Sequence, residues 1–177
     1  MTATLAYAAW PDVDCQISTE AGRRLHAPAR RLASTRDVAR TLVQGARREL
    51  LVVGYAITDV QFREHLMRRG MDRVSVMVVS DRNQPGSREL LREWPAGAAP
   101  LTALHGVEPE RGKDWKMHGK AVVADRTDAL VGSANFTGSG LGRNLEIGVH
   151  VTGRRAGEIC ELVERLYGDG WLVAARA

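Results

Sequence analysis

The feature that most limits the fold of this chain is an uninterrupted apolar run from Leu50 to Ile57. A strand with one solvated face alternates apolar and polar residues, whereas a strand buried on both faces forms a continuous apolar segment. A second run of this kind spans residues 74–79. Because such strands need a covering layer on each face of their sheet, the sequence predicts an α/β fold.

The patterns around these two runs predict the remaining elements. The expected helices span 34–48, 58–70 and 88–94, with a last helix around 159–166, and the expected strands span 50–57, 74–79, 101–104, 117–124, 129–131 and 145–151. Residues 136–143 are expected to form a glycine-rich loop. A chain of 177 residues fits one domain. We therefore expect a single mixed β-sheet flanked by helices over residues 34–177, preceded by an N-terminal arm or extension at 1–33.

The residues that suggest chemistry are concentrated near the C-terminal end. His118 and Lys120 lie one residue apart in the predicted strand 117–124, so their side chains should share one face. An anion would relieve the cost of burying a lysine, and a neutral histidine can attack a substrate or transfer a proton. The pair indicates a site for a phosphodiester. Asp125 falls on the opposite face, where we expect it to make structural hydrogen bonds.

Three further residues complete the expected site. Gly132-Ser133-Ala-Asn135 follows the next predicted strand, and its small residues allow a ligand to approach the backbone closely. The Ser133 hydroxyl and the Asn135 amide can donate to oxygens on which charge develops. Glu146 can accept the second ring N–H of His118 and so fix its tautomer.

Each of these residues also has a purely structural interpretation. His118 alone could be a hydrogen-bonded histidine without a role in catalysis, and Lys120 could protect a strand edge. The combination is more specific than its parts, because His-x-Lys, the aspartate, Gly-Ser-x-Asn and Asn-x-Glu follow one another within thirty residues. That order favours a catalytic site.

The pattern His118-x-Lys120-x4-Asp125-x6-Gly132-Ser133 resembles the HKD motif of the phospholipase D superfamily. The segment Gly-Ser-Ala-Asn-Phe-Thr is close to the form found in the small bacterial nucleases of that superfamily. The resemblance covers roughly residues 34–167. Segments 34–37, 54–58 and 144–148 are also similar to the phospholipase D-like subgroup of bacterial DISARM antiphage systems.

The resemblance implies a metal-independent phosphodiesterase without a cofactor. One histidine attacks phosphorus to form a phosphohistidine, a second protonates the leaving oxygen, and water completes the turnover, while lysine and asparagine take the electrostatic role of a metal ion. The implied roles are His118 as nucleophile or acid, Lys120 and Asn135 as phosphate ligands, Ser133 as a secondary donor, Glu146 as the residue that orients His118, and Asp125 and Gly132 as structural parts of the motif.

The chain contains only one copy of the motif. Its other histidines, at positions 26, 65, 105 and 150, are not followed by lysine at the second position. Because the implied reaction needs two histidines, the second must come from another chain. The simplest arrangement is a homodimer with two-fold symmetry in which the two motifs face each other.

The distribution of basic residues suggests nucleic acid as the substrate, with DNA favoured. Residues 21–48 hold eight arginines against one acid, in a chain of net charge +4. Such a stretch could bind a polyanion or could simply be a solvated helix face, since all but three of the 25 basic residues are arginine. Trp115 and Lys116 could line a nucleic-acid groove or belong to a solvated loop. Arg143 is a candidate for a phosphate contact.

The sequence thus favours a homodimeric nuclease, with other defence proteins as potential partners. A lipid-active phospholipase D would share the site, although no amphipathic, aromatic-bearing segment suited to a membrane surface is evident. A nucleic-acid-binding subunit of a defence complex that does not cleave is the other alternative. No apolar run is long enough to span a membrane, the N-terminus lacks a signal peptide, and two isolated cysteines fit a reducing compartment, so we expect a cytoplasmic protein.

Overall fold

The computed structural model describes residues 13–18, 34–107 and 116–176. Its centre is an eight-stranded sheet of order β1-β7-β6-β5-β2-β3-β4-β8. The strands are β1 (Val13–Ser18), β2 (Glu49–Gly54), β3 (Ser75–Ser80), β4 (Leu101–Gly106), β5 (Ala121–Ala124), β6 (Asp128–Gly132), β7 (Glu146–Thr152) and β8 (Leu172–Ala174). β2, β3 and β4 are parallel, and the other neighbouring pairs are antiparallel. The expected mixed sheet is confirmed.

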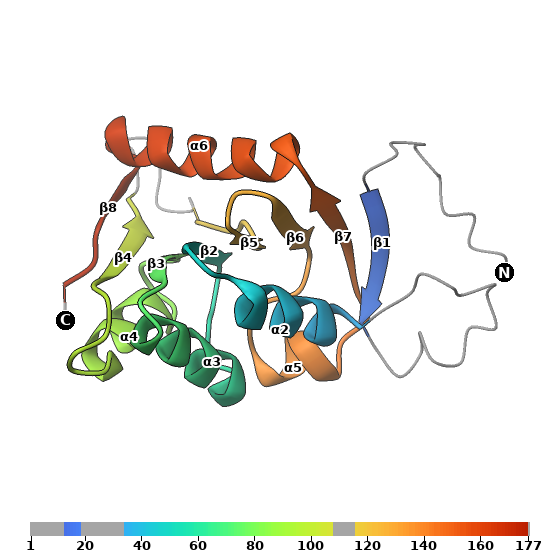
Figure 1. Cartoon of the computed structure of the whole chain (residues 1–177), viewed down its shortest axis with the longest axis horizontal. Helices are drawn as coiled ribbons and strands as arrows, with labels where there is room; N and C mark the ends of the chain where they lie inside the picture. Colours follow the sequence, from blue (N-terminus) through green and yellow to red (C-terminus); the bar gives the residue numbers. More distant parts are fainter. Residues whose placement is uncertain (1–12, 19–33, 108–115, 177) are drawn as a thin grey trace, which may run out of the picture.

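Helices cover both faces of the sheet, as the continuous apolar runs require. α2 (Thr35–Gly45), α3 (Val60–Met71), α4 (Ser87–Glu93) and α5 (Gly138–Gly142) lie on one face, and α6 (Arg154–Gly168) lies along the other (Figure 1). Successive side chains of β2 pack against opposite helical layers. Val52 belongs to the apolar cluster beneath α2 to α5, and Val53 belongs to the cluster beneath α6. The predicted α/β architecture is therefore correct.

Two N-cap residues begin the helices that precede the site. The Ser34 hydroxyl accepts the backbone N–H of Asp37 at 3.0 Å, and the Asp59 carboxylate accepts that of Phe62 at 2.9 Å. Each cap satisfies an N–H group that has no partner within its helix. None of the helices in the described ranges is long and apolar enough to cross a membrane.

The strand predicted for 117–124 begins only at Ala121, and its first four residues approach the sheet as an irregular segment. The ladder between β5 and β2 stops at the pair Ala121–Val53, because β2 ends at Gly54 and the chain then leaves the sheet. The two motif side chains before Ala121 therefore emerge from a loop, and strand alternation does not set their directions.

Two other segments differ from the sequence interpretation. The expected loop at 136–143 contains the short helix α5, which Thr137 begins by accepting the backbone N–H of Gly140 at 3.1 Å. The region interpreted as an N-terminal arm includes β1, which pairs antiparallel with β7 at the edge of the sheet.

Candidate active site

The sheet brings the five predicted catalytic residues to one edge. β5 begins, β6 ends and β7 begins at this edge, because the three strands run antiparallel to one another. His118 and Lys120 precede β5, Ser133 and Asn135 follow β6, and Glu146 is the first residue of β7. We refer to this side of the sheet, formed by the strand ends, as the catalytic edge. The carboxyl end of β2 also reaches it.

Lys120 is a buried cation with only 7% of its surface exposed. Its ammonium Nζ lies 2.9 Å from His118 Nδ1 and donates to the His118 carbonyl oxygen at 2.7 Å. Burial lowers the pKa of Lys120, and the negative charge of Glu146 opposes that shift in part. No carboxylate in the described ranges lies within ion-pairing distance of Nζ. The ammonium is thus held ready for an anion.

His118 is exposed, and one side of its ring packs against Tyr55. The two ring centroids are 4.9 Å apart and the rings are tilted by 49°. Lys120 Nζ lies 5.9 Å from the centroid of the same tyrosine. Tyr55 therefore contacts both motif side chains, a role that the site prediction missed. The available signal was a polar aromatic residue placed directly after the buried strand β2.

Glu146 does not hold His118 as predicted. Its carboxylate accepts hydrogen bonds from the Ser133 hydroxyl and, at 3.2 Å, from the Asn144 amide, and no bond to His118 occurs among the described residues. The reason is local, since Ser133 sits opposite the start of β7, where its hydroxyl also accepts the Ile147 N–H at 3.1 Å. Glu146 acts on the site through its charge next to Lys120.

Asn135 carries an unsatisfied polar atom in the site. Its side-chain oxygen Oδ1 is buried, and nothing in the described part of the chain donates to it. A Cβ at Gly140 would lie 2.3 Å from the Asn135 backbone oxygen, so only glycine lets α5 pack this closely against the asparagine. Because an amide oxygen only accepts hydrogen bonds, the side-chain NH2 group of Asn135, and not Oδ1, is the group suited to phosphate oxygens.

Asp81 is the second residue that the site prediction missed. It follows β3, is 5% exposed, and accepts the backbone N–H groups of Met117 at 3.1 Å and Asn83 at 2.9 Å. Met117 directly precedes His118, so Asp81 fixes the segment that carries the histidine. An acid immediately after a buried parallel strand is a signal that the sequence does contain.

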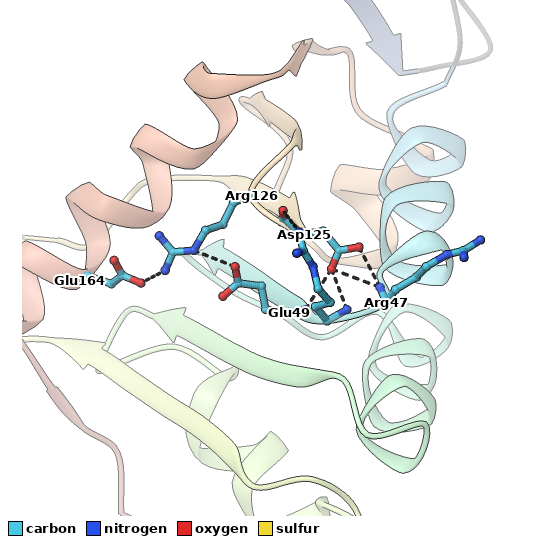
Figure 2. Close-up of polar contacts among 6 residues, drawn as sticks. Arg47, Glu49, Asp125, Arg126 and Glu164 are labelled. Carbon is cyan, nitrogen blue, oxygen red and sulfur yellow. Dashed lines mark hydrogen bonds and ion pairs between the residues drawn. The ribbon is translucent and has the colours of Figure 1, made fainter.

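Asp125 lies at the other end of β5, in the turn that leads to β6. Its carboxylate accepts the backbone N–H groups of Arg47 at 3.0 Å, Arg48 at 2.8 Å and Glu49 at 3.0 Å (Figure 2). Burial alone would raise the pKa of Asp125, but these three N–H groups and the charge of Arg48 outweigh it and hold that pKa below its usual value. The neighbouring Arg126 binds both Glu49 and Glu164, which joins the turn to α6 (Figure 2).

Gly132 and the remaining predicted residues have simpler surroundings. A Cβ at Gly132 would lie 2.7 Å from the Ile147 backbone oxygen, so glycine permits the close approach of β6 and β7. Arg143 is exposed and its guanidinium donates to the Ser139 hydroxyl at 3.3 Å. Lys116 is exposed, whereas Trp115 lies outside the described residues.

Half of the arginine-rich stretch at 21–48 can be placed, since residues 19–33 lie outside the described ranges. Arg36 pairs with Asp59 at 3.6 Å, and Arg40 pairs with Asp37 at 2.9 Å.

Within the ranges that the structure describes, no group of three His, Cys, Asp or Glu side chains is arranged to hold a metal ion.

The fold and the motif define a family. Residues 40–169 match the family described as "Cardiolipin synthase, PLD-like domain", and the chain belongs to this phospholipase D-like family. The resemblance to the superfamily seen in the sequence is thereby confirmed. A curated relative, the DISARM protein DrmC of Bacillus paralicheniformis, is 28% identical over 127 residues, which are 71% of this chain and 52% of the relative. The chain thus spans about half the length of that relative.

Solved structures show the same fold. Nuc, a phospholipase D family member from Salmonella typhimurium, superimposes with a TM-score of 0.65 at 17% identity and covers 93% of this chain and 98% of its own. NucT from Helicobacter pylori superimposes with a TM-score of 0.63 at 14% identity and covers 78% of this chain and 89% of its own. At these identities the likeness establishes the architecture.

Proposed function

We propose that the chain is a metal-independent phosphodiesterase that cleaves nucleic acid, DNA in the first instance, through a phosphohistidine intermediate. The observation that carries this proposal is the buried Lys120 ammonium, held 2.9 Å from His118 Nδ1. A buried cation next to a nucleophile suits an anionic substrate, and membership of the phospholipase D-like family supports the reaction class.

The geometry supports a definite order of events. An ammonium can only donate, so its 2.9 Å contact with Nδ1 favours a neutral His118 whose ring proton is on Nε2. A bound phosphodiester competes for Lys120 and releases His118 to attack phosphorus. A nitrogen–phosphorus bond forms, the bond to the leaving oxygen breaks, and a second histidine gives that oxygen a proton. Water then attacks phosphorus, the nitrogen–phosphorus bond breaks and frees His118, and the water gives up a proton to the second histidine.

We propose that the second histidine is His118 of another copy, in a homodimer whose two motifs share one site. Leu145 is 69% exposed and Ile147 is 54% exposed, and both flank Glu146 at the catalytic edge. Apolar side chains exposed beside polar catalytic groups suit the core of a protein interface. Their position supports an interface that closes over the site.

We also propose that the reaction serves antiphage defence, together with other defence proteins in the cytoplasm. The support is the 28% identity to a DISARM protein. Arg143, Lys116 and Trp115 remain proposed contacts to the nucleic acid, and residues 34–177 remain the proposed catalytic domain.

The proposed activity is tested by cleavage of single- and double-stranded DNA and RNA in excess EDTA. The wild type is compared with His118→Ala and with the control His65→Ala, whose imidazole lies on α3 near Gln44. We expect cutting that resists EDTA, falls by about 10³-fold or more in His118→Ala, and is retained in the control. Equal cutting by all three proteins would contradict the proposal. Cleavage of phosphatidylcholine vesicles without cleavage of nucleic acid would favour the lipid-active alternative.

The shared site is tested by mixing the wild type with a tenfold excess of His118→Ala under conditions that allow subunits to exchange. A mixed dimer would hold only one histidine, so specific activity per wild-type chain should fall about tenfold. Unchanged activity after exchange would show that each chain acts alone.

A further inference from the structure

The catalytic edge continues beyond β2 to the carboxyl ends of β3 and β4, where a small polar hollow opens. Arg82, Arg88 and His105 line it together with Asp81 and Gln84, above a floor that includes Ser80 and Ser87. Because β3 and β4 are parallel, with Ser80 paired to His105, their carboxyl ends meet at the edge where β2 ends. The hollow and the His118 site thus open on the same edge of the sheet.

The floor of the hollow is rigid. The Ser80 hydroxyl donates to the Ser87 hydroxyl at 2.9 Å, and Ser87 donates in turn to the Leu104 carbonyl oxygen at 2.6 Å. Both serines are at least 98% buried. These bonds join β3, α4 and β4, so the arginines on either side are presented from a fixed frame.

The two arginines of the hollow lack acidic partners. Arg36, Arg63 and Arg126 each form an ion pair, whereas neither Arg82 nor Arg88 does so within the described ranges. Burial lowers the pKa of His105, and the positive charges of Arg82 and Arg88 lower it further. The hollow therefore holds two positive charges, the backbone-bound carboxylate of Asp81 and a neutral imidazole.

The neighbouring acids are already engaged by backbone groups. Asp81 accepts the N–H groups of Met117 and Asn83, and Glu89 accepts the Gly86 N–H at 2.6 Å. Neither carboxylate forms an ion pair with the arginines of the hollow, although Glu89 lies next to Arg88 in sequence. An external anion is the natural partner for these cations.

The hollow lies at a useful distance from the reacting histidine. β4 is three strand positions from β5, which corresponds to about 14 Å at the usual strand spacing. A nucleic-acid strand that keeps B-form stacking, whether single or paired, advances about 3.4 Å per nucleotide, so this distance corresponds to about four nucleotides. Asp81 connects the two places, since it precedes Arg82 and binds the amide of Met117.

We propose that Arg82, Arg88 and His105 form a second phosphate-binding site, which holds the substrate backbone about four nucleotides from the bond that is cleaved. The proposal rests on the proposed function, because it assumes that the chain at His118 is nucleic acid. The arginines neutralise phosphate oxygens, and the neutral imidazole supplies a hydrogen bond. The site sets the minimum length of a tightly bound substrate.

The test measures binding of a labelled single-stranded 12-mer and a trimer by fluorescence anisotropy, in a His118→Ala background that prevents turnover. Arg82→Gln/Arg88→Gln is compared with Arg154→Gln/Arg155→Gln, two exposed arginines at the start of α6 on the opposite edge. We expect the Kd for the 12-mer to rise at least tenfold in the first pair. The slope of log K against log salt should flatten by about 1.4, which is about 0.7 for each lost phosphate contact. The control pair should change the Kd by less than twofold.

Length dependence sharpens the result. The trimer cannot span both places, so the first pair of substitutions should weaken trimer binding far less than 12-mer binding. Equal losses for both lengths would overturn the proposal, as would 12-mer affinity and salt slope equal to those of the control pair. Thermal unfolding of both double variants shows whether α4 still packs, and the single substitution Arg82→Gln, outside α4, replaces the pair if it does not.

Separate outcomes distinguish this proposal from the proposed function. Absence of EDTA-resistant cutting by protein with an intact His118, together with 12-mer binding that depends on the arginines, would refute the nuclease and support the phosphate site. EDTA-resistant cutting, together with a Kd for the 12-mer that the arginine substitutions leave unchanged, would support the nuclease and refute the phosphate site. Inorganic phosphate at 10 mM and constant ionic strength is then added as a competitor, to test whether the site binds free anions. If the two arginine substitutions weaken phosphate binding but leave the Kd for the 12-mer unchanged, the site does not hold the nucleic-acid backbone and the proposal is overturned.

Discussion

The two ends of β5 differ in how their charges are satisfied. Just before the strand, Lys120 is buried without a carboxylate partner in the described ranges, and burial lowers its pKa. Just after the strand, Asp125 accepts three backbone N–H groups, which lower its pKa. One short strand therefore carries an unfavourable charge at the catalytic edge and a favourable one at the opposite edge. The predicted motif thus joins a residue suited to chemistry, Lys120, to a residue suited to stability, Asp125.

The largest expected effect comes from Lys120→Met, which keeps the length of the side chain and removes its charge. Cleavage should fall by about 10²–10³-fold, because the phosphate loses its cation. Stability should rise by about 0.5–2 kcal/mol, since a lysine with a lowered folded-state pKa opposes folding at neutral pH and ceases to do so as pH rises toward the unfolded-state pKa. Urea unfolding at pH 7 measures the change. A loss of stability would break the comparison, because Lys120 would then support the fold.

Asp125→Ala should give the opposite pattern. Three backbone N–H groups lose a charged acceptor, so the free energy of unfolding should fall by about 3 kcal/mol. Cleavage per folded molecule at low temperature should stay within about fivefold of wild type, because the substitution lies beyond the far end of the strand from His118. Urea unfolding and single-turnover cleavage at 10 °C measure the two effects. A complete loss of activity in folded protein would assign Asp125 to the reaction.

Tyr55 provides a smaller effect at the catalytic edge. Tyr55→Leu removes the ring that packs 4.9 Å from His118, so the imidazole samples more orientations and kcat should fall about tenfold with a smaller change in KM. Tyr55→Phe keeps the ring and should restore most of the activity. If the phenylalanine variant is as impaired as the leucine variant, the hydroxyl rather than the packing is what matters.

The smallest expected effect is the pH dependence of stability at the Asp125 end. Because its folded-state pKa is lowered, Asp125 contributes stability that is complete above its unfolded-state pKa of about 3.9 and is lost as pH falls through the folded-state value. Unfolding free energies from pH 5 down to pH 2 should therefore fall less steeply in Asp125→Asn than in the wild type. Identical slopes would mean that the carboxylate is not the source of this stability.

The sequence predicts those features that short-range patterns determine. Continuous apolar runs identified β2 and β3. These predictions succeed because burial leaves a signature in consecutive residues. The motif also predicted a common site for His118, Lys120, Ser133 and Asn135, and the structure places all four next to the same ends of β5 and β6.

The remaining features depend on contacts between distant segments. Tyr55 meets His118, and Asp81 binds Met117, only once β2, β3 and β5 have assembled. Glu146 was expected to bind His118 but binds Ser133. The reason is that Ser133 follows β6 directly and lies opposite the start of β7, where Glu146 is the first residue. The edge strand β1 was missed although Val13–Ser18 alternates apolar and polar residues, because the segment around it carries no other pattern.

The bond from Met117 to Asp81 has a practical consequence for engineering. It anchors the chain one residue before His118, to a buried carboxylate that belongs to a different part of the sheet. A reporter or recognition module attached on the N-terminal side of this anchor should therefore leave the position of the histidine unchanged.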